Sequence, residues 1–291
     1  MSCNSLEKKQ FGKNGRKISE IGMGTYFDKR WIRIAKHGWR PGASKKVRAL
    51  VAGLDGGMNL IDSAEAYESE TFVAKAIKGR RRDELFIATK VWLDHLRRDD
   101  LLAALERSLR RLETSYVDLY QVHFPNPSVP ISETMSGMEE LKECGKILSI
   151  GVSNFSLAQL IDASSALRRS EIASIQVNYS LMHRDIERDL LPHCQKNGIV
   201  VLAYYPLGHG RLASEKVKMR EVCRQTSKTR AQVALNWLAS TPSVFPIPRA
   251  STPEHVRENI GASGWSLTPD QKAELERQFP APVQERSPTN A

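Results

Sequence analysis

No long apolar run occurs in this chain. Its apolar segments stop well short of the roughly 18 consecutive residues that a membrane-spanning helix needs. The first ten residues, Met1–Gln10, also lack the apolar core of a secretory signal. These absences argue against a membrane protein and against export, so we expect a cytoplasmic protein with no membrane partner.

Cysteine is scarce and scattered. No Cys-x-x-Cys pair occurs, and no cysteine stands at a metal-ligand spacing from a histidine. We therefore predict no metal site, and we expect free thiols in a reducing compartment. The four cysteines are Cys3, Cys144, Cys194 and Cys223.

Acidic residues are outnumbered, because 33 Asp and Glu face 43 Lys and Arg, and the formal charge is +10. Such a charge suggests a nucleic-acid partner, but no recognition motif accompanies it. Aromatic residues make up only 7% of the chain and do not alternate with basic ones, as a base-stacking groove would require. We therefore predict no nucleic-acid partner. The charge favours anionic small molecules instead.

The chain does contain short apolar runs that end in ionisable side chains. Three of them span Asn59–Asp62, Leu85–Lys90 and Val117–His123. Short apolar runs separated by helical patterns are typical of parallel strands that are buried on both faces. In a (β/α)8 barrel the carboxyl ends of such strands carry the active site. The candidate catalytic residues are Asp62, Tyr67, Lys90 and His123.

These four side chains predict a proton donor for a carbonyl group. A free tyrosine has a pKa near 10 and is a poor acid at neutral pH. We expect the ammonium group of Lys90 to lower the pKa of Tyr67, and Asp62 to hold Lys90 in place. His123 can orient the carbonyl oxygen. A carbonyl that receives a proton in this way also needs a hydride from a nicotinamide or a flavin.

The rest of the pattern predicts a single α/β domain over residues 1–291. Eight strand–helix alternations follow one another without a linker. An Asn-Gly pair within Phe11–Ile18 predicts a hairpin with a two-residue type I′ turn, and the first barrel strand is expected at Glu20–Thr25. Thr268–Gln271 is a capping box that predicts a last helix. An irregular tail, Pro280–Ala291, follows it.

The motifs resemble those of the aldo-keto reductase superfamily from about Gln10 to Gly261. The resemblance implies a (β/α)8 TIM barrel with an N-terminal β-hairpin that closes the bottom and a short C-terminal helix and tail. It also implies that the four residues above form the family's catalytic tetrad. Its further motifs are Gly151-Val152-Ser153-Asn154-Phe155, Gln176-Val177-Asn178-Tyr179 and Ala203-Tyr204-Tyr205-Pro206-Leu207-Gly208.

The resemblance implies NADPH as the cofactor, although the Gly-x-Gly-x-x-Gly fingerprint of dinucleotide-binding domains is absent. It places Tyr204 on the nicotinamide ring and Arg249 at the adenosine 2′-phosphate. Arg249 precedes the helix that begins near Thr252-Pro253, and a helix N-terminus favours a phosphate. NADH remains possible with lower preference. The predicted cofactor-binding residues are Gly24, Thr25, Asp62, Ser153, Asn154, Gln176, Tyr204, Tyr205, Pro206, Leu207, Gly208, Arg249, Ser251, His255, Glu258 and Asn259.

Aromatic residues follow several strands and predict an apolar pocket for a small aldehyde or ketone. The predicted substrate-binding residues are Tyr26, Trp92, His123 and Phe124. A long basic loop, Phe27–Ala43, leaves the first strand at the same end of the barrel. With Trp31 and Trp39 as apolar anchors, it could wall the pocket and favour aromatic or anionic substrates. The alternative is a variable surface loop.

Two other functions remain open at this point. A cofactor-sensing binding subunit, like the potassium-channel β subunits that share the fold, would carry the same tetrad. A barrel lyase or isomerase without a redox cofactor is the second. We expect a monomer or a weak homo-oligomer, and the physiological substrate and the favoured reaction direction stay open.

Overall fold

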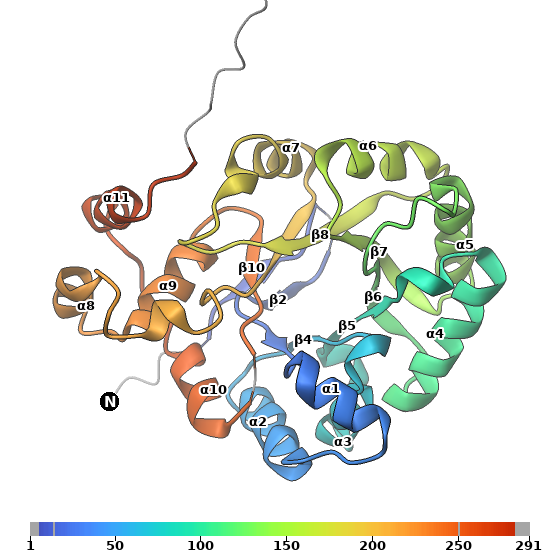
Figure 1. The fold of residues 1–291 in the computed structure, drawn as a ribbon, viewed down its shortest axis with the longest axis horizontal. Helices are drawn as coiled ribbons and strands as arrows, with labels where there is room; N and C mark the ends of the chain where they lie inside the picture. The colour runs from blue at the N-terminus through green and yellow to red at the C-terminus, as the bar shows by residue number, and fades with distance from the viewer. Residues whose placement is uncertain (1–5, 14, 250, 283–291) are drawn as a thin grey trace, which may run out of the picture.

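Eight parallel strands form one curled sheet in the computed structural model, which describes residues 6–13, 15–249 and 251–282. The strands are paired in chain order, from the first barrel strand to the last (Figure 1). Helices surround the sheet. The strands are β3 (Met23–Gly24), β4 (Leu60–Asp62), β5 (Phe86–Val91), β6 (Val117–Val122), β7 (Ile147–Ser153), β8 (Ile172–Asn178), β9 (Val200–Tyr204) and β10 (Val244–Pro246).

Two backbone hydrogen bonds join the first and last strands and close the barrel. Gly22 N donates to Pro246 O at 2.9 Å, and Gly24 N donates to Pro248 O at 2.9 Å. The approach is close, because a Cβ on Gly24 would lie 2.9 Å from Ile247 O. The predicted (β/α)8 barrel is therefore confirmed. Its first strand is shorter than the expected Glu20–Thr25, since regular pairing with β4 covers only Met23 and Gly24.

Apolar stripes explain why the outer segments are helical. In α4, Leu101, Leu105, Leu109 and Leu112 are buried at helical spacing, while the arginines point outward. The apolar pattern does not indicate α8, which has seven residues and buries only Val222. The helices are α1 (Lys29–Lys36), α2 (Ala43–Asp55), α3 (Glu70–Ile77), α4 (Arg98–Leu112), α5 (Ile131–Glu143), α6 (Leu157–Ala166), α7 (Leu190–Asn197), α8 (Arg220–Thr226), α9 (Arg230–Ala239), α10 (Pro253–Ile260) and α11 (Pro269–Gln278).

The predicted hairpin closes the bottom of the barrel. Its strands β1 (Lys8–Gln10) and β2 (Lys17–Ser19) are antiparallel. The ring of Phe11 lies 4.6 Å from that of Phe86 at the start of β5, and 5.9 Å from that of Phe245 in β10. The two-residue turn is wrong, because six residues separate β1 from β2. Asn14, on which that prediction rested, lies outside the described residues.

The basic segment Phe27–Ala43 contains a helix, α1, where a loop was expected (Figure 1). Asp28 caps it by accepting a hydrogen bond from Trp31 N at 2.7 Å. Trp31 is buried as predicted, but Trp39 is 67% exposed and anchors nothing. A helix forms here because a capping residue precedes a run whose apolar positions repeat with helical spacing.

The C-terminal end follows the sequence prediction as far as the structure describes it. Thr268 caps α11 through the predicted capping box. The predicted tail continues beyond the described residues, which end at residue 282. In the described part of the chain, no helix has the length and apolar character to cross a membrane.

We expect the bottom plug to contribute strongly to stability. Replacing Phe11 with alanine removes a buried ring from the interior of the barrel, and such changes cost about 3–5 kcal/mol of unfolding free energy. Urea denaturation followed by circular dichroism measures the loss. Leu148→Ala is the control, because Leu148 is 50% exposed and its loss should cost about 0.5 kcal/mol or less. Equal losses in the two variants would contradict a structural role for the hairpin.

Candidate active site

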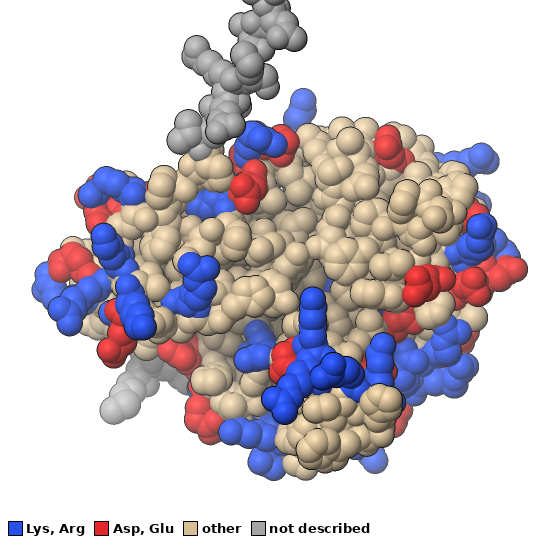
Figure 2. All heavy atoms as spheres, in the orientation of Figure 1, with Lys and Arg blue, Asp and Glu red and all other residues tan. Residues whose placement is uncertain are grey.

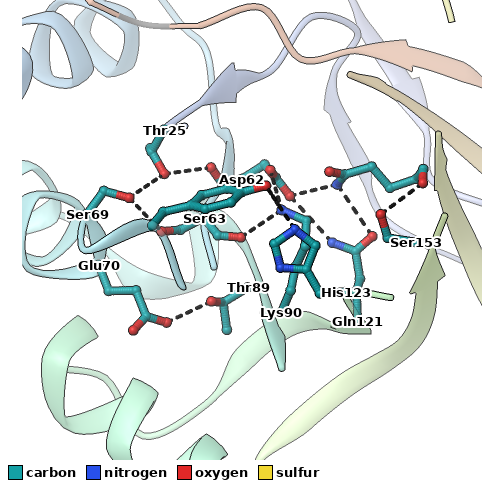
Figure 3. Close-up of polar contacts among 12 residues, drawn as sticks. Thr25, Asp62, Ser63, Ser69, Glu70, Thr89, Lys90, Gln121, His123 and Ser153 are labelled. Carbon is teal, nitrogen blue, oxygen red and sulfur yellow. Dashed lines mark hydrogen bonds and ion pairs between the residues drawn. The ribbon is translucent and has the colours of Figure 1, made fainter. Parts of the chain in front are cut away.

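The structure brings the four predicted catalytic side chains together at the carboxyl ends of the strands. Figure 3 shows Asp62, Lys90 and His123 close to one another. Asp62 is the last residue of β4, and Lys90 lies near the end of β5. Tyr67 ends a short 3-10 helix, η1 (Glu65–Tyr67), that returns the chain over β4. His123 follows β6 directly. Parallel pairing of neighbouring strands aligns these ends, so residues far apart in the sequence meet.

Lys90 lies at the base of this cluster and is fully buried. Its Nζ donates to Asp62 Oδ2 at 2.7 Å and to Ser63 O at 2.8 Å. Burial lowers the pKa of Lys90, and the charge of Asp62 opposes that shift. The carboxylate of Asp62 therefore favours the charged form of Lys90, which burial alone would disfavour.

The second oxygen of Asp62 is also engaged. Asp62 Oδ1 accepts a hydrogen bond from Gln176 Nε2 at 2.8 Å and one from Gln121 Nε2 at 3.4 Å. Gln176 was predicted as a cofactor residue from its place at the end of a strand. Its side-chain nitrogen donates to the catalytic carboxylate, which it helps to orient, and the residue also lines the cleft. Gln121 was not predicted, although its place in β6, two residues before His123, is a usable signal.

The hydroxyl group of Tyr67 lies between two nitrogens, 3.4 Å from Lys90 Nζ and 3.3 Å from His123 Nε2. Burial raises the pKa of Tyr67 well above its usual value, and the charge of Asp62 raises it further. The pKa of Tyr67 is therefore raised and not lowered as expected from Lys90, because burial is the largest influence on it. At neutral pH the phenol keeps its proton.

His123 is a neutral imidazole. Burial lowers its pKa to about 2, and the charge of Lys90 contributes to the same shift. Its ring is stacked on that of Phe124, with centroids 5.0 Å apart, and meets Trp92 edge-on at 5.2 Å. A neutral ring among aromatic side chains can bind a carbonyl oxygen without adding a charge.

A cleft of about 1280 Å³ opens above these residues. Three predicted residues do not line it: Thr25 and Lys90 are buried beneath it, and Gly208 lies in a turn. Thr25 Oγ1 donates to Asp62 O at 3.0 Å, and its contact with a cofactor stays a prediction. The predicted residues that line the cleft are Gly24, Tyr26, Asp62, Tyr67, Trp92, His123, Phe124, Ser153, Asn154, Gln176, Tyr204, Tyr205, Pro206, Leu207, Arg249, Ser251, His255, Glu258 and Asn259.

One wall of the cleft is built by polar side chains that hold one another. Ser153 Oγ donates to Gln176 O at 2.9 Å, and Asn154 Nδ2 donates to His123 O at 2.9 Å. The hydroxyl of Tyr204 donates to Asn154 Oδ1 at 2.8 Å. Asn154 has a φ of 62°, a left-handed conformation that asparagine tolerates better than most residues. These bonds fix the positions of Asn154 and Tyr204 at the cleft wall.

The far end of the cleft reaches the beginning of α10. Thr252 caps this helix by accepting a hydrogen bond from His255 N at 3.2 Å. The guanidinium of Arg249 donates to Phe27 O, which ties this end to the segment that leads into α1. Arg249 brings positive charge to this end of the cleft, and the N-terminus of a helix favours an anion, so this end suits one.

Glu65 is a pocket residue that the sequence analysis missed. Its carboxylate accepts hydrogen bonds from Trp92 N and, at 3.0 Å, from His95 Nδ1. This contact ties η1, which carries Tyr67, to the chain that follows β5. No sequence signal marks the pairing, because it depends on how two loops meet.

Within residues 6–13, 15–249 and 251–282, no group of three His, Cys, Asp or Glu could hold a metal ion.

A closed (β/α)8 barrel with ionisable side chains at the carboxyl ends of its strands has the architecture of a barrel enzyme. The chain belongs to the aldo/keto reductase family, whose sequence profile matches residues 20–278. It is 37% identical over 244 residues to methylglyoxal reductase YeaE of Escherichia coli, and the alignment covers 81% of this chain and 85% of that protein. The chain is therefore an oxidoreductase that acts on carbonyl groups.

Solved structures agree with this assignment. A thermostable aldo-keto reductase crystallised with the inhibitor epalrestat is 40% identical, with a TM-score of 0.83 over 94% of this chain and 100% of that one. An aldo/keto reductase from Klebsiella pneumoniae, crystallised with NADP and acetate, is 34% identical, with a TM-score of 0.84 over 96% and 98% of the two chains. Both likenesses extend over nearly the whole fold.

The low pKa of His123 predicts a pH-dependent loss of stability. The folded protein keeps this ring neutral while the unfolded chain protonates it near pH 6.5, so stability falls as the pH falls below that value. Between about pH 6 and pH 4.5, wild type should lose about 1.4 kcal/mol more per pH unit than His123→Gln. Urea denaturation at several pH values measures the difference. His37→Gln, at an exposed histidine, should behave like wild type, and parallel curves for wild type and His123→Gln would contradict the buried neutral ring.

Proposed function

We propose that this protein reduces aldehydes or ketones to alcohols with NADPH, and that Tyr67 donates the proton. One observation carries the proposal: the Tyr67 hydroxyl lies at the floor of the cleft, within 3.4 Å of both Lys90 Nζ and His123 Nε2. The phenol is protonated at neutral pH because burial raises its pKa. The resting site therefore holds the proton that the reaction consumes.

The dimensions of the cleft support a cofactor together with a substrate. Its volume of about 1280 Å³ exceeds the roughly 300–1,000 Å³ of most small-molecule sites. In the proposed arrangement Ser153, Asn154 and Gln176 hold the nicotinamide amide, and Tyr204 stacks on the ring. Arg249 and the start of α10 receive the adenosine 2′-phosphate, with Asn259 at the adenine. When bound, the nicotinamide supplies the hydride.

The other tetrad residues control the proton of Tyr67. Once the phenol has given its proton to the carbonyl oxygen, a phenolate remains, and Lys90 stabilises it from 3.4 Å. Asp62 keeps Lys90 charged and in place. His123 orients the carbonyl oxygen beside the Tyr67 hydroxyl. A neutral imidazole suits this role, because it leaves the proton transfer to tyrosine.

The substrate side of the cleft supports small carbonyl compounds. Tyr26, Trp92 and Phe124 line it, and a relative over most of the chain is a methylglyoxal reductase. NADPH is the proposed cofactor, as in the Klebsiella pneumoniae structures that hold NADP or NADPH, and weaker use of NADH belongs to the same proposal. The cytoplasmic location, the extent of the domain and the oligomeric state stay predictions.

Tyr67→Phe tests the proton donor. Loss of the phenolic oxygen should lower kcat for carbonyl reduction by about 10²–10⁴-fold, the usual contribution of a general acid, while NADPH affinity stays close to that of wild type. NADPH oxidation, followed by absorbance over a panel of aldehydes and ketones, measures kcat, and fluorescence titration measures affinity. Tyr116→Phe is the control, because it removes a phenol that does not line the cleft. Turnover within about tenfold of wild type would remove Tyr67 from the mechanism.

Arg249→Ala tests the site of the 2′-phosphate. A charge-assisted hydrogen bond contributes roughly 1.5–3 kcal/mol, so the variant should lose NADPH affinity by about tenfold or more and lose little NADH affinity. Fluorescence titration with both cofactors measures this. Arg257→Ala is the control, since Arg257 lies in α10 but does not line the cleft. Equal losses for NADPH and NADH would place the 2′-phosphate elsewhere.

A further inference from the structure

One face of α1 presents a row of basic side chains to the cleft. Lys29, Arg33 and Lys36 are spaced at i, i+4 and i+7, so they lie along one side of the helix. All three line the cleft, together with Ile32 between them. Figure 2 shows basic side chains gathered over α1 at the lower centre of the face on which the cleft opens.

The opposite face of α1 keeps the helix in this orientation. Trp31 and Ala35 are buried, and the Trp31 ring meets those of Phe27 at 5.0 Å and Phe72 at 5.6 Å. Trp31 Nε1 donates to Pro41 O at 3.0 Å. Rotating the helix to turn its basic face away from the cleft would expose the buried indole. The apolar anchor therefore fixes where the charges point.

The three cations have no partner within the described part of the chain. None of them makes a hydrogen bond, an ion pair or a ring contact there. The nearby acids of the cleft are each engaged: Glu65 with His95, and Glu68 with Arg40 at 3.2 Å. Asp28 accepts the capping bond of α1. Positive charge on this wall is thus left unbalanced.

Two contacts position the two ends of α1 relative to the cleft. Arg249 donates to Phe27 O just before α1, so the first turn of α1 is on the side of the proposed cofactor phosphate. Arg40 pairs with Glu68, which follows Tyr67, so the chain that leaves α1 is joined to the segment that carries the proton donor. The second half of α1, with Arg33 and Lys36, therefore leads toward the segment that carries Tyr67.

We propose that Arg33 and Lys36 select carbonyl substrates that carry a separate anionic group, a carboxylate or a phosphate. The proposal rests on the proposed function, because the carbonyl itself must lie at Tyr67. Unpaired cations on the wall of a cleft raise the local concentration of an anion and orient it. The same chemistry would also receive the diphosphate of the cofactor, and the test must separate these two sources.

A matched pair of substrates provides the test: para-formylbenzoate and its neutral methyl ester share the same aldehyde and ring. The double variant R33Q/K36Q should raise the KM of the carboxylate about tenfold, the scale of charge pairs at a partly exposed site. The KM of the ester and the Kd of NADPH should change little. R30Q is the control, because Arg30 lies on α1, is exposed and does not line the cleft.

The dependence of KM on ionic strength provides a second test, on the wild-type protein. Raising the ionic strength from about 0.01 M to about 0.3 M screens exposed charges, so the KM of the carboxylate should rise several-fold while that of the ester stays the same. In R33Q/K36Q this salt dependence should disappear. R30Q should keep it.

Each alternative outcome is distinct. If neither aldehyde is reduced by wild type, the proposed function fails. If the ester is reduced and the double variant leaves the carboxylate-to-ester ratio unchanged, the substrate inference fails while the proposed function stands. If the Kd of NADPH rises and both substrates lose the same factor, the row binds the cofactor diphosphate and the substrate inference is overturned.

Discussion

The buried ion pair between Lys90 and Asp62 is the constraint on which the rest of the site depends. Removing two charges from water is costly, and a buried pair is tolerated only when its remaining hydrogen-bonding groups are satisfied. Ser63 O, Gln176 and Gln121 supply those bonds. They come from strands β6 and β8 and from the end of β4. The pair therefore requires several strands to be in register, and the register in turn sets the distance from Lys90 to the Tyr67 hydroxyl.

The residues that stabilise the barrel and the residues of the candidate active site lie at opposite ends of the barrel axis. At the bottom, Phe11 and Phe245 belong to an apolar cluster that fills the interior, and the hairpin covers it. At the top, the strand ends carry carboxylate, ammonium, amide and imidazole groups that hold one another. Helix α1 is added at the top with its apolar face inward. A segment between the first strand and the first barrel helix can therefore alter the cleft wall without disturbing the tetrad.

Much of the fold and of the site could be predicted because both follow from local patterns. Buried strands are short apolar runs, and Thr252 and Thr268 mark helix starts through the hydrogen bonds that their own side chains make. The helix in Phe27–Ala43 escaped prediction because its apolar stripe is narrow and basic residues surround it. Trp39 shows the limit of composition: a large apolar side chain favours burial but does not ensure it, and this one is exposed.

The sequence by itself determined which ionisable residues follow which strands, and hence that Asp62, Tyr67, Lys90 and His123 would meet at one end of a parallel barrel. That inference needs only chain order, because parallel strands align their carboxyl ends. Only the tertiary structure decided the protonation states, the engagement of Gln176 with Asp62, and the face of α1 that meets the cleft. These depend on burial and on distances between segments that are remote in the chain. Lys90 illustrates the difference: its charge was evident from the sequence, but the burial that raises the pKa of the neighbouring Tyr67 was not.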